Sequence, residues 1–379
     1  MSFAAMRSTA RCMKTSRSFA VALACLLVLA LAVGCAETES PTTPGAPNAP
    51  TAPNALIITM DTLRADHIAP YGDAQSRTAA MQRLASEGTL FENAMSPMQM
   101  TRPSHGSLLT SLYPRDHGIV NNKIALDSQF RSLARVFRDA GYATAAFTAV
   151  KLLAPGSGFE QGFDHFDAPR EARTRDARAV IDAAEQWLAA RPAGQPFFVW
   201  LHLFDPHTPY APPEDLRPAA TPGPGGDLAS AGIEELIALS RNHGGDLPGS
   251  AVERAKALYR GDIEYADREL GRLLSTLERD ALLDRTAIVL TADHGECFEN
   301  GIYFEHSDCL YEGAARIPLI FRFADRVARG VRRDEVVEIL DVAPTLLSLL
   351  DLDVPAAFLG RRLFDATSKA REAAFLQHP

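Results

Sequence analysis

The chain has 379 residues, of which 46% are hydrophobic and 22% charged, and its formal net charge is −9 at pH 7. This length and composition suit one large globular α/β domain. The negative charge disfavours a nucleic-acid partner, because the phosphate backbone attracts basic proteins. We therefore expect a globular protein that does not bind nucleic acid.

The first 34 residues have the pattern of a secretory signal peptide, with four basic residues before the apolar run 19–33. The segment ends in Leu-Ala-Val-Gly-Cys at residues 31–35, which is similar to the cleavage site of bacterial lipoproteins. We expect cleavage before Cys35, a lipid on Cys35 and attachment to the membrane, on the periplasmic or extracellular face of the cell envelope. Ordinary cleavage and secretion is the alternative, and the run is shorter than the roughly 20 residues of a spanning helix.

Residues 35–53 are rich in proline and threonine and cannot bury a core, so we expect an extended tether. Residues 54–379 would then form the folded domain.

Two short apolar runs, at residues 55–60 and 286–291, are typical of buried strands. Asp61 directly follows the first run, and Asp293 and His294 follow the second. Ligands gather at the carboxyl ends of strands in open α/β sheets, so these three side chains are expected to share one site.

Thr101 lies between these runs, in the segment Met-Thr-Arg-Pro-Ser-His-Gly. A threonine hydroxyl is a weak nucleophile that a bound metal or a base can activate. A helix predicted over 104–112 would place Thr101 just before its N-terminus, where backbone N–H groups favour an anionic ester. Asp61, Asp293, His294 and Thr101 could together bind a divalent metal ion, and these ligand types do not select one metal.

The remaining pattern alternates helices and strands. Helices are predicted over 132–140, 177–190 and 252–279, and strands over 143–148 and 197–203. This order predicts an α/β fold with a mixed, mainly parallel sheet between helices, and a Gly- and Pro-rich insertion over 211–250. Cys297 and Cys309 flank a loop and are equally compatible with a disulfide and with two free thiols.

The chain resembles a known family, the sulfatases of the alkaline phosphatase superfamily. Five stretches carry the resemblance, and they occur in family order: 54–72, 100–118, 197–210, 259–267 and 291–319. The stretches are spread along the chain, and the resemblance extends from Asn54 to about Gly360.

The resemblance implies an alkaline phosphatase/sulfatase-like fold and specific site residues. Asp61, Asp293 and His294 would bind one metal ion, which is calcium by family resemblance, whereas the His and Thr ligands favour zinc or manganese. Thr101 would be the nucleophile, with His207 and His306 at the ester oxygens or the leaving group. His207 could instead be a turn residue, and His306 has a similar alternative. Arg64, His105 and Lys151 are candidate contacts for an anionic sulfate or phosphate ester, or else ordinary surface charges.

Two positions depart from the family pattern. Sulfate-ester sulfatases usually carry a cysteine or serine, converted to formylglycine, where Thr101 stands, and a second aspartate where Thr62 stands. A formylglycine hydrate can expel sulfate, whereas an esterified threonine needs attack by water, which is easier at phosphorus.

We therefore expect a metal-dependent hydrolase of sulfuric or phosphoric esters that leans toward phosphoryl chemistry. The alternatives are an envelope phosphoethanolamine or phosphoglycerol transferase, and a non-catalytic sulfatase-like lipoprotein. The smaller C-terminal subdomain of many family members is expected to be short or missing, because the chain ends soon after Gly360.

Overall fold

The computed structural model describes residues 52–378 apart from 172, 219–237, 239–246, 248 and 300. These residues belong to one compact unit that begins at Pro50. The predicted signal peptide, Cys35, most of the tether and most of the 211–250 insertion lie outside the described residues.

An eight-stranded sheet forms the centre of this unit, in the order β10-β2-β9-β6-β1-β5-β3-β4. Its strands are β1 (Asn54–Met60), β2 (Thr89–Met95), β3 (Ala143–Thr148), β4 (His165–Asp167), β5 (Phe197–Leu203), β6 (Thr286–Ala292), β9 (Arg316–Arg322) and β10 (Val331–Glu338). Only β9 pairs antiparallel with its two described neighbours, β2 and β6, whereas the other pairings are parallel. The predicted mixed, mainly parallel sheet is confirmed.

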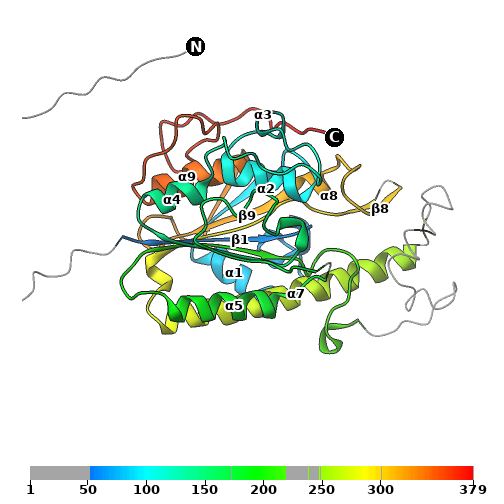
Figure 1. Ribbon diagram of the computed structural model, residues 1–379. Coiled ribbons are helices and arrows are strands. Elements are labelled where there is room, and N and C mark those ends of the chain that lie inside the picture. The colour runs from blue at the N-terminus through cyan, green and yellow to red at the C-terminus, as the bar shows by residue number, and fades with distance from the viewer. Residues whose placement is uncertain are drawn as a thin grey trace, which may run out of the picture. The chain divides into compact units, whose positions relative to one another are not determined.

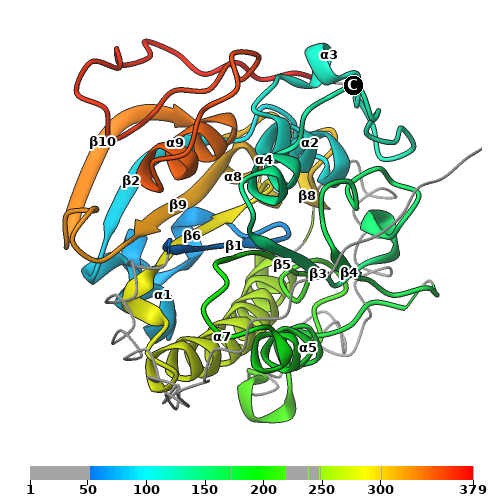
Figure 2. The ribbon, with the colours of Figure 1, turned by 60° about the vertical axis from the view of Figure 1, so that its left-hand side comes forward.

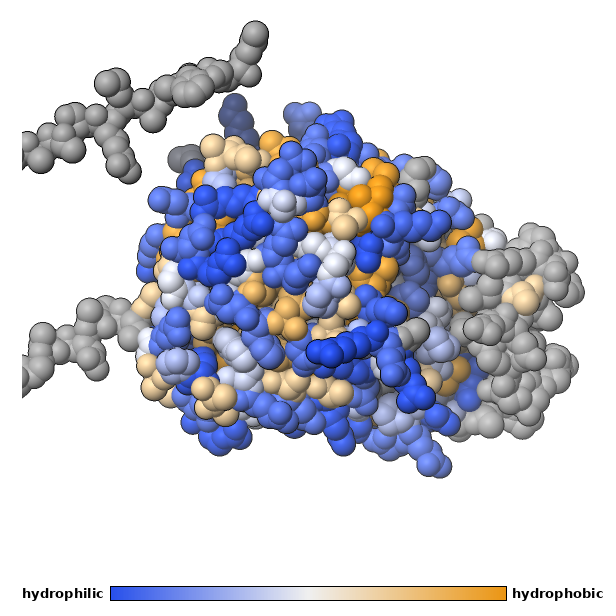
Figure 3. All heavy atoms as spheres, viewed as in Figure 1, coloured by the Kyte–Doolittle hydropathy of each residue, from blue (hydrophilic) through white to orange (hydrophobic). Residues whose placement is uncertain are grey.

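Helices cover both faces of the sheet. The α-helices are α1 (Ala79–Ser86), α2 (Thr101–Thr110), α3 (Pro114–His117), α4 (Leu133–Asp139), α5 (Ala177–Ala190), α7 (Gly249–Arg279), α8 (Glu312–Ala315) and α9 (Val342–Leu349). Figures 1 and 2 show α1, α5 and α7 on one face, and α2, α4 and α9 on the other. The face seen in Figure 3 is mainly hydrophilic, as expected for helices that turn their apolar sides to the sheet.

The three central strands β1, β5 and β6 are buried along their whole length. Each is a nearly continuous apolar run, because side chains on both faces of a covered parallel sheet must pack against helices. Their carboxyl ends lie side by side, with Met60 opposite both Leu203 and Ala292. The residues that follow these strands are therefore brought together at one edge of the sheet.

Strand β9 contains a proline in the interior of the sheet. Pro318 has no N–H to donate, and the pairing of β2 with β9 shifts register between Phe91 and Ala94, opposite this position. Arg316 Nε donates to the Glu92 carbonyl within the irregularity, at 2.8 Å. The bulge thus accommodates the proline without leaving the neighbouring carbonyl unpaired.

Helix α7 ties the segments after β1 to the rest of the unit. The Tyr259 hydroxyl donates to the Thr62 carbonyl at 2.7 Å and accepts from the Arg64 N–H at 2.8 Å. The Asp267 carboxylate accepts from the N–H groups of Ala80 and Met81, at 2.9 and 2.8 Å. Since Thr78 makes no side-chain cap to α1, Asp267 supplies that cap from another helix.

Helix α2 corrects one expected boundary. It begins at Thr101 and ends at Thr110, followed by Ser111 in the left-handed region with φ 55°. The prediction over 104–112 started too late, because Pro103 can occupy the first turn of a helix, where an N–H is not needed. Thr101 is consequently the first residue of the helix and does not precede it.

Among the residues that the structure describes, no helix combines the length and apolar character required to cross a membrane.

Candidate active site

The site lies where β1 and β6 end. Asp61 follows β1, and its backbone N–H donates to the Leu203 carbonyl of β5 at 2.9 Å. Asp293 and His294 follow β6, and all three side chains are completely buried. One ligand atom from each of Asp61, Asp293 and His294 lies within 4.8 Å of the other two. The structure brings together the three residues predicted as metal ligands.

Each of these three side chains is fixed through one atom and free at another. Asp293 Oδ1 accepts from the N–H groups of Thr62 and His294, at 3.3 and 2.9 Å. His294 Nδ1 donates to the Gly295 carbonyl at 3.0 Å. Asp61 Oδ2 contacts His202 Nε2 at 3.2 Å. The remaining atoms, Asp61 Oδ1, Asp293 Oδ2 and His294 Nε2, have no hydrogen-bond partner among the described residues.

These three buried atoms fit a divalent cation. Burial lowers the pKa of His294 to about 3, so the imidazole is neutral and Nε2 presents a lone pair. Burial, and then the charge of Asp61, raises the pKa of Asp293 well above its usual range. Burial alone would also raise the pKa of Asp61, but the His202 hydrogen bond and nearby imidazoles hold it low. A cation between the carboxylates would remove their repulsion and satisfy all three atoms.

Thr101 is held beside this cluster by helix α2. Its side chain is buried, and Oγ1 lies 3.5 Å from Asp61 Oδ2. Ser104 Oγ in the same turn donates to the Asp293 carbonyl at 2.6 Å, which joins the helix to the end of β6. The N-terminus of α2 therefore lies beside the cluster of Asp61, Asp293 and His294.

His105 lies beneath Thr101 and is fully buried. Its Nδ1 donates to the Thr101 carbonyl at 2.8 Å, and its Nε2 lies 3.1 Å from Thr59 Oγ1. Burial lowers its pKa to about 3, so the ring is neutral. Both ring nitrogens form hydrogen bonds to protein atoms, and the bond to the Thr101 carbonyl helps to hold Thr101 in place. The predicted contact of His105 with the substrate stays a prediction.

His306 lies on the other side of the cluster, in the segment after the hairpin of β7 (Cys297–Glu299) and β8 (Ile302–Glu305). Its ring stacks on His294 with centroids 4.4 Å apart, and its Nδ1 donates to Glu296 Oε1 at 3.2 Å. Burial would lower the pKa of His306, but the Glu296 carboxylate outweighs burial and raises it. A protonated imidazole paired with a carboxylate is suited to protonate a leaving group.

His207 follows β5 and also faces this region. Its ring stacks on Phe204 at 4.2 Å, and its centroid is 5.2 Å from that of His306. Nδ1 donates to the Thr208 carbonyl at 2.7 Å, so Nε2 is the nitrogen that can reach a substrate. The two predicted catalytic histidines are therefore neighbours.

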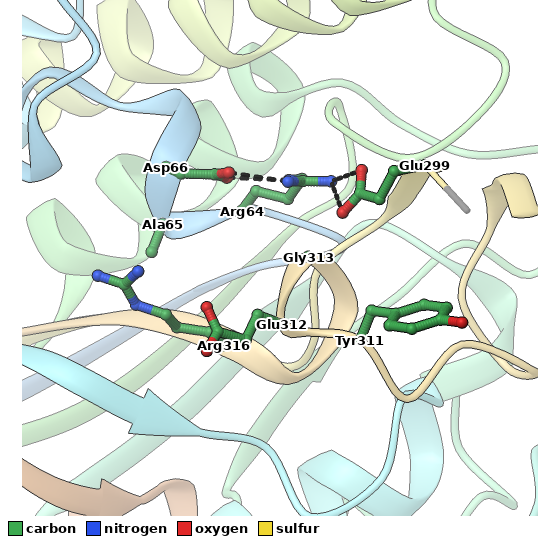
Figure 4. A pocket seen from close by; sticks show the side chains of 8 residues that line it. All are labelled: Arg64, Ala65, Asp66, Glu299, Tyr311, Glu312, Gly313 and Arg316. Carbon is green, nitrogen blue, oxygen red and sulfur yellow. Dashed lines mark hydrogen bonds and ion pairs between the residues drawn. The ribbon is translucent and has the colours of Figure 1, made fainter.

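Arg64 is paired with protein carboxylates. Its guanidinium bonds Asp66 at 2.8 Å and Glu299 at 2.9 Å, and donates to the Glu296 carbonyl at 2.9 Å. Figure 4 shows the contacts of Arg64 with Asp66 and Glu299. They lie in a pocket of about 360 Å³ that is lined also by Tyr311, Glu312, Gly313 and Arg316. A substrate contact by Arg64 stays a prediction, and its observed bonds instead support the backbone of Glu296.

Lys151 is exposed in the short turn after β3, at the sheet edge that carries the site. Its predicted contact with the anionic ester stays a prediction.

Two residues of the site, Glu296 and His202, were not predicted from the sequence. Glu296 lies two residues after His294 in a stretch that resembles the sulfatases, and only the fold reveals its contact with His306. His202 lies within the continuous apolar run of β5, where a histidine is easily taken for part of the core. Thr62, one of the two departures, has a left-handed backbone with φ 58°, which is rare for a β-branched residue. Its buried Oγ1 lacks a hydrogen-bond partner in the described part of the chain.

Cys297 and Cys309 form a disulfide, with Cα atoms 6.5 Å apart. This pairing resolves the alternative that the sequence left open. The bond closes the loop that carries His306 and thereby restricts its motion beside His294.

Comparisons with known proteins agree with this architecture. The sulfatase family model matches residues 53–352. An arylsulfatase of Clostridium perfringens is 25% identical over 82% of this chain and 78% of its own length. A multifunctional alkaline phosphatase superfamily protein of Trinickia caryophylli is 26% identical over 82% of this chain and 76% of its own.

Solved structures show the same fold. A protein solved in complex with its substrate D-glucosamine-2-N,6-O-disulfate has a TM-score of 0.67 at 22% identity, over 82% of this chain and 78% of that one. The phosphonate monoester hydrolase of Agrobacterium radiobacter has a TM-score of 0.65 at 21% identity, over 79% and 74%. Together with the matched family model, these findings place the chain in the sulfatase family of the alkaline phosphatase superfamily, a family of metal-dependent ester hydrolases.

Proposed function

We propose that the protein hydrolyses phosphoric, phosphonic or sulfuric esters with Thr101 as its nucleophile. The observation that carries the proposal is the position of Thr101 Oγ1, 3.5 Å from Asp61 Oδ2 and beside three ligand atoms that lack partners. A hydroxyl at a helix N-terminus beside a cation site is suited to attack an anionic ester.

Asp61, Asp293 and His294 would hold one divalent metal ion, with Thr101 Oγ1, 3.5 Å from Asp61 Oδ2, as a fourth ligand. When bound, the ion would lower the pKa of the threonine hydroxyl and neutralise part of the charge of the ester. Zinc or manganese suits the mixed oxygen and imidazole ligands, and calcium is the family alternative.

The reaction has two steps. Deprotonated Thr101 Oγ1, whose proton has gone to solvent, attacks phosphorus or sulfur, the bond to the leaving group breaks, and His306 Nε2 protonates the departing oxygen. Neutral His306 then takes a proton from water, whose oxygen attacks the Thr101 ester. The acid leaves, and Thr101 Oγ1 is released in its deprotonated form for the next turnover. Glu296 keeps His306 oriented through Nδ1, and His207 Nε2 contacts a non-bridging ester oxygen.

The threonine favours phosphorus over sulfur. Its ester has no second hydroxyl with which to expel the acid, so water must attack the central atom. One solved structure of the same fold is a phosphonate monoester hydrolase, which supports a phosphorus ester as the substrate class.

The test is a substrate panel with purified protein and added Mn²⁺, Zn²⁺ or Ca²⁺: an aryl sulfate, an aryl phosphate, a diaryl phosphate and an aryl phosphonate monoester. We expect turnover of a phosphorus ester, its loss with a chelator, and a fall of roughly 10³-fold or more in Thr101→Ala. Thr110→Ala is the matched control, because Thr110 ends the same helix and donates only to the Gly106 carbonyl. Wild-type rates in Thr101→Ala would refute the nucleophile, and no turnover of any ester would favour the transferase or binding alternatives.

We further propose that the protein is an envelope lipoprotein anchored through Cys35. The Cys297–Cys309 disulfide supports an oxidising compartment outside the cytoplasm. Labelling with a radioactive fatty acid should mark the wild type and not Cys35→Ser, and an unlabelled, normally secreted wild type would contradict the anchor.

A further inference from the structure

His202 occupies an unusual position for a strand residue. It lies in β5 opposite Thr59 of β1, two residues before Asp61, and its side chain is fully buried. The ring makes two contacts with different partners. Ala149 N–H donates to Nδ1 at 3.4 Å, and Nε2 lies 3.2 Å from Asp61 Oδ2.

These contacts assign the tautomer of His202. A backbone N–H can only donate, so the Nδ1 that receives it carries no proton. The proton of the neutral ring is then on Nε2, which donates to the Asp61 carboxylate. The end of β3, through Ala149, thus determines which nitrogen of a β5 histidine faces a β1 aspartate.

The hydrogen bond has a direct effect on the orientation of Asp61. Oδ2 receives His202 Nε2 at 3.2 Å and Thr101 Oγ1 at 3.5 Å, whereas Oδ1 has no partner in the described part of the chain. Oδ1 lies 3.8 Å from His294 Nε2, on the side of the other free ligand atoms. Without the His202 donor, the carboxylate could rotate and point Oδ2 into the cluster or away from it.

We propose that His202 is a positioning residue that directs Asp61 Oδ1 toward the metal ion, with its tautomer set by the Ala149 N–H. The inference rests on the proposed metal site, since Asp61 must be a ligand for its orientation to matter. Hydrogen bonds to ligating carboxylates typically contribute 10- to 100-fold to metal affinity. His202 touches neither the substrate nor the metal and acts through Asp61.

Two substitutions separate the contacts of His202. The Asn side chain in His202→Asn keeps an oxygen near the place of Nδ1, which can accept from Ala149, but it is too short to reach Asp61. The Gln side chain in His202→Gln places an amide N–H near the position of Nε2, which can donate to Asp61.

A second buried histidine provides a matched control. His117 Nδ1 accepts from the Ile119 N–H at 3.1 Å, and its Nε2 lies 3.1 Å from Ser107 Oγ, away from the ligand cluster. His117→Asn removes the same type of contact without changing the surroundings of Asp61.

The experiment is calorimetric titration of the metal-free full chain with Mn²⁺, alongside thermal melting. We expect the Kd of His202→Asn to rise about 10- to 100-fold, with His202→Gln close to wild type and His117→Asn unchanged. Activity of His202→Asn should recover at high Mn²⁺, which a purely structural defect would not allow.

An unchanged Kd in a folded His202→Asn, or an equal rise in His117→Asn, would overturn the inference. Should His202→Asn fail to fold, the Kd of His202→Gln decides: a rise of ten-fold or more overturns it. A wild type that fails to bind Mn²⁺, or an Asp61→Asn variant that binds normally, would instead refute the proposed metal site.

Discussion

At the scale of single residues, the site is defined by the side-chain atoms that make no hydrogen bond to the protein. Asp61, Asp293 and His294 each use one atom for a hydrogen bond to the protein and present the other to the cluster. Thr101 and His306 approach the same cluster from α2 and from the segment after β8. The proposed ligands, nucleophile and acid are thus oriented by separate elements.

The contact of His306 with Glu296 distinguishes the expected role of His306 from that of its neighbour His207. Because His306 is paired with a buried carboxylate that raises its pKa, we expect it to be the acid that protonates the leaving group. His306→Asn should then lose about 10²- to 10⁴-fold in rate on esters with poor leaving groups, and much less on nitrophenyl esters. His207→Asn should lose a similar factor on both. Steady-state rates on a series of aryl esters test this, and the opposite pattern would assign the acid to His207.

At the scale of elements, the central strands were predictable and the outer ones were not. The runs 143–148 and 197–203 match β3 and β5, because fully buried strands have a continuous apolar pattern. Strand β10 contains four charged residues in its first five, and β9 contains Pro318, so neither has that pattern. Their pairing depends on distant contacts, including the bulge opposite Pro318.

The same division applies to the site. Asp61, Asp293 and His294 follow strand runs and could be predicted from position alone. His202 and Glu296 could not, since their importance comes from contacts that only the folded chain makes. His202 contacts Asp61 at the end of the neighbouring strand, and Glu296 contacts His306 beyond the hairpin of β7 and β8. Residues that act through another residue leave little trace in a local sequence pattern.

The stretch 259–267, which resembles the sulfatases, has a structural role in α7. Asp267 on α7 caps the N-terminus of α1 with two hydrogen bonds, so Asp267→Ala should lower the free energy of unfolding by about 1–3 kcal/mol. Urea unfolding measures this, with Glu253→Ala on the exposed side of α7 as control. Metal affinity should be unchanged, and a variant as stable as wild type would contradict the capping role.

At the scale of the whole molecule, two buried carboxyl groups link stability to pH. Burial, and then the charge of Asp205, raises the pKa of Asp262 to about 8, and burial raises the pKa of Asp205 to about 7. Both pKa values lie above the value of about 3.9 for an unfolded aspartate. The folded state therefore binds more protons between these values, and stability falls as pH rises through this window.

Asp262→Asn removes this ionisation and keeps an oxygen that can accept from the Ala211 N–H. We expect the melting temperature of the variant to fall less than that of wild type between pH 5 and about pH 8.5. Thermal melting across this range is the measurement, and Asp139→Asn, at an exposed position, is the control. Parallel pH profiles for wild type and Asp262→Asn would contradict the buried-carboxyl account.

The central claim is that Thr101 becomes covalently esterified during turnover. The most direct measurement is peptide mass spectrometry of the metal-loaded protein, acid-quenched during the hydrolysis of an aryl phosphate or phosphonate ester. We predict one phosphoryl or phosphonyl group on Thr101, absent from Thr101→Ala. Turnover with an unmodified Thr101, or with the group on another residue, would contradict the account.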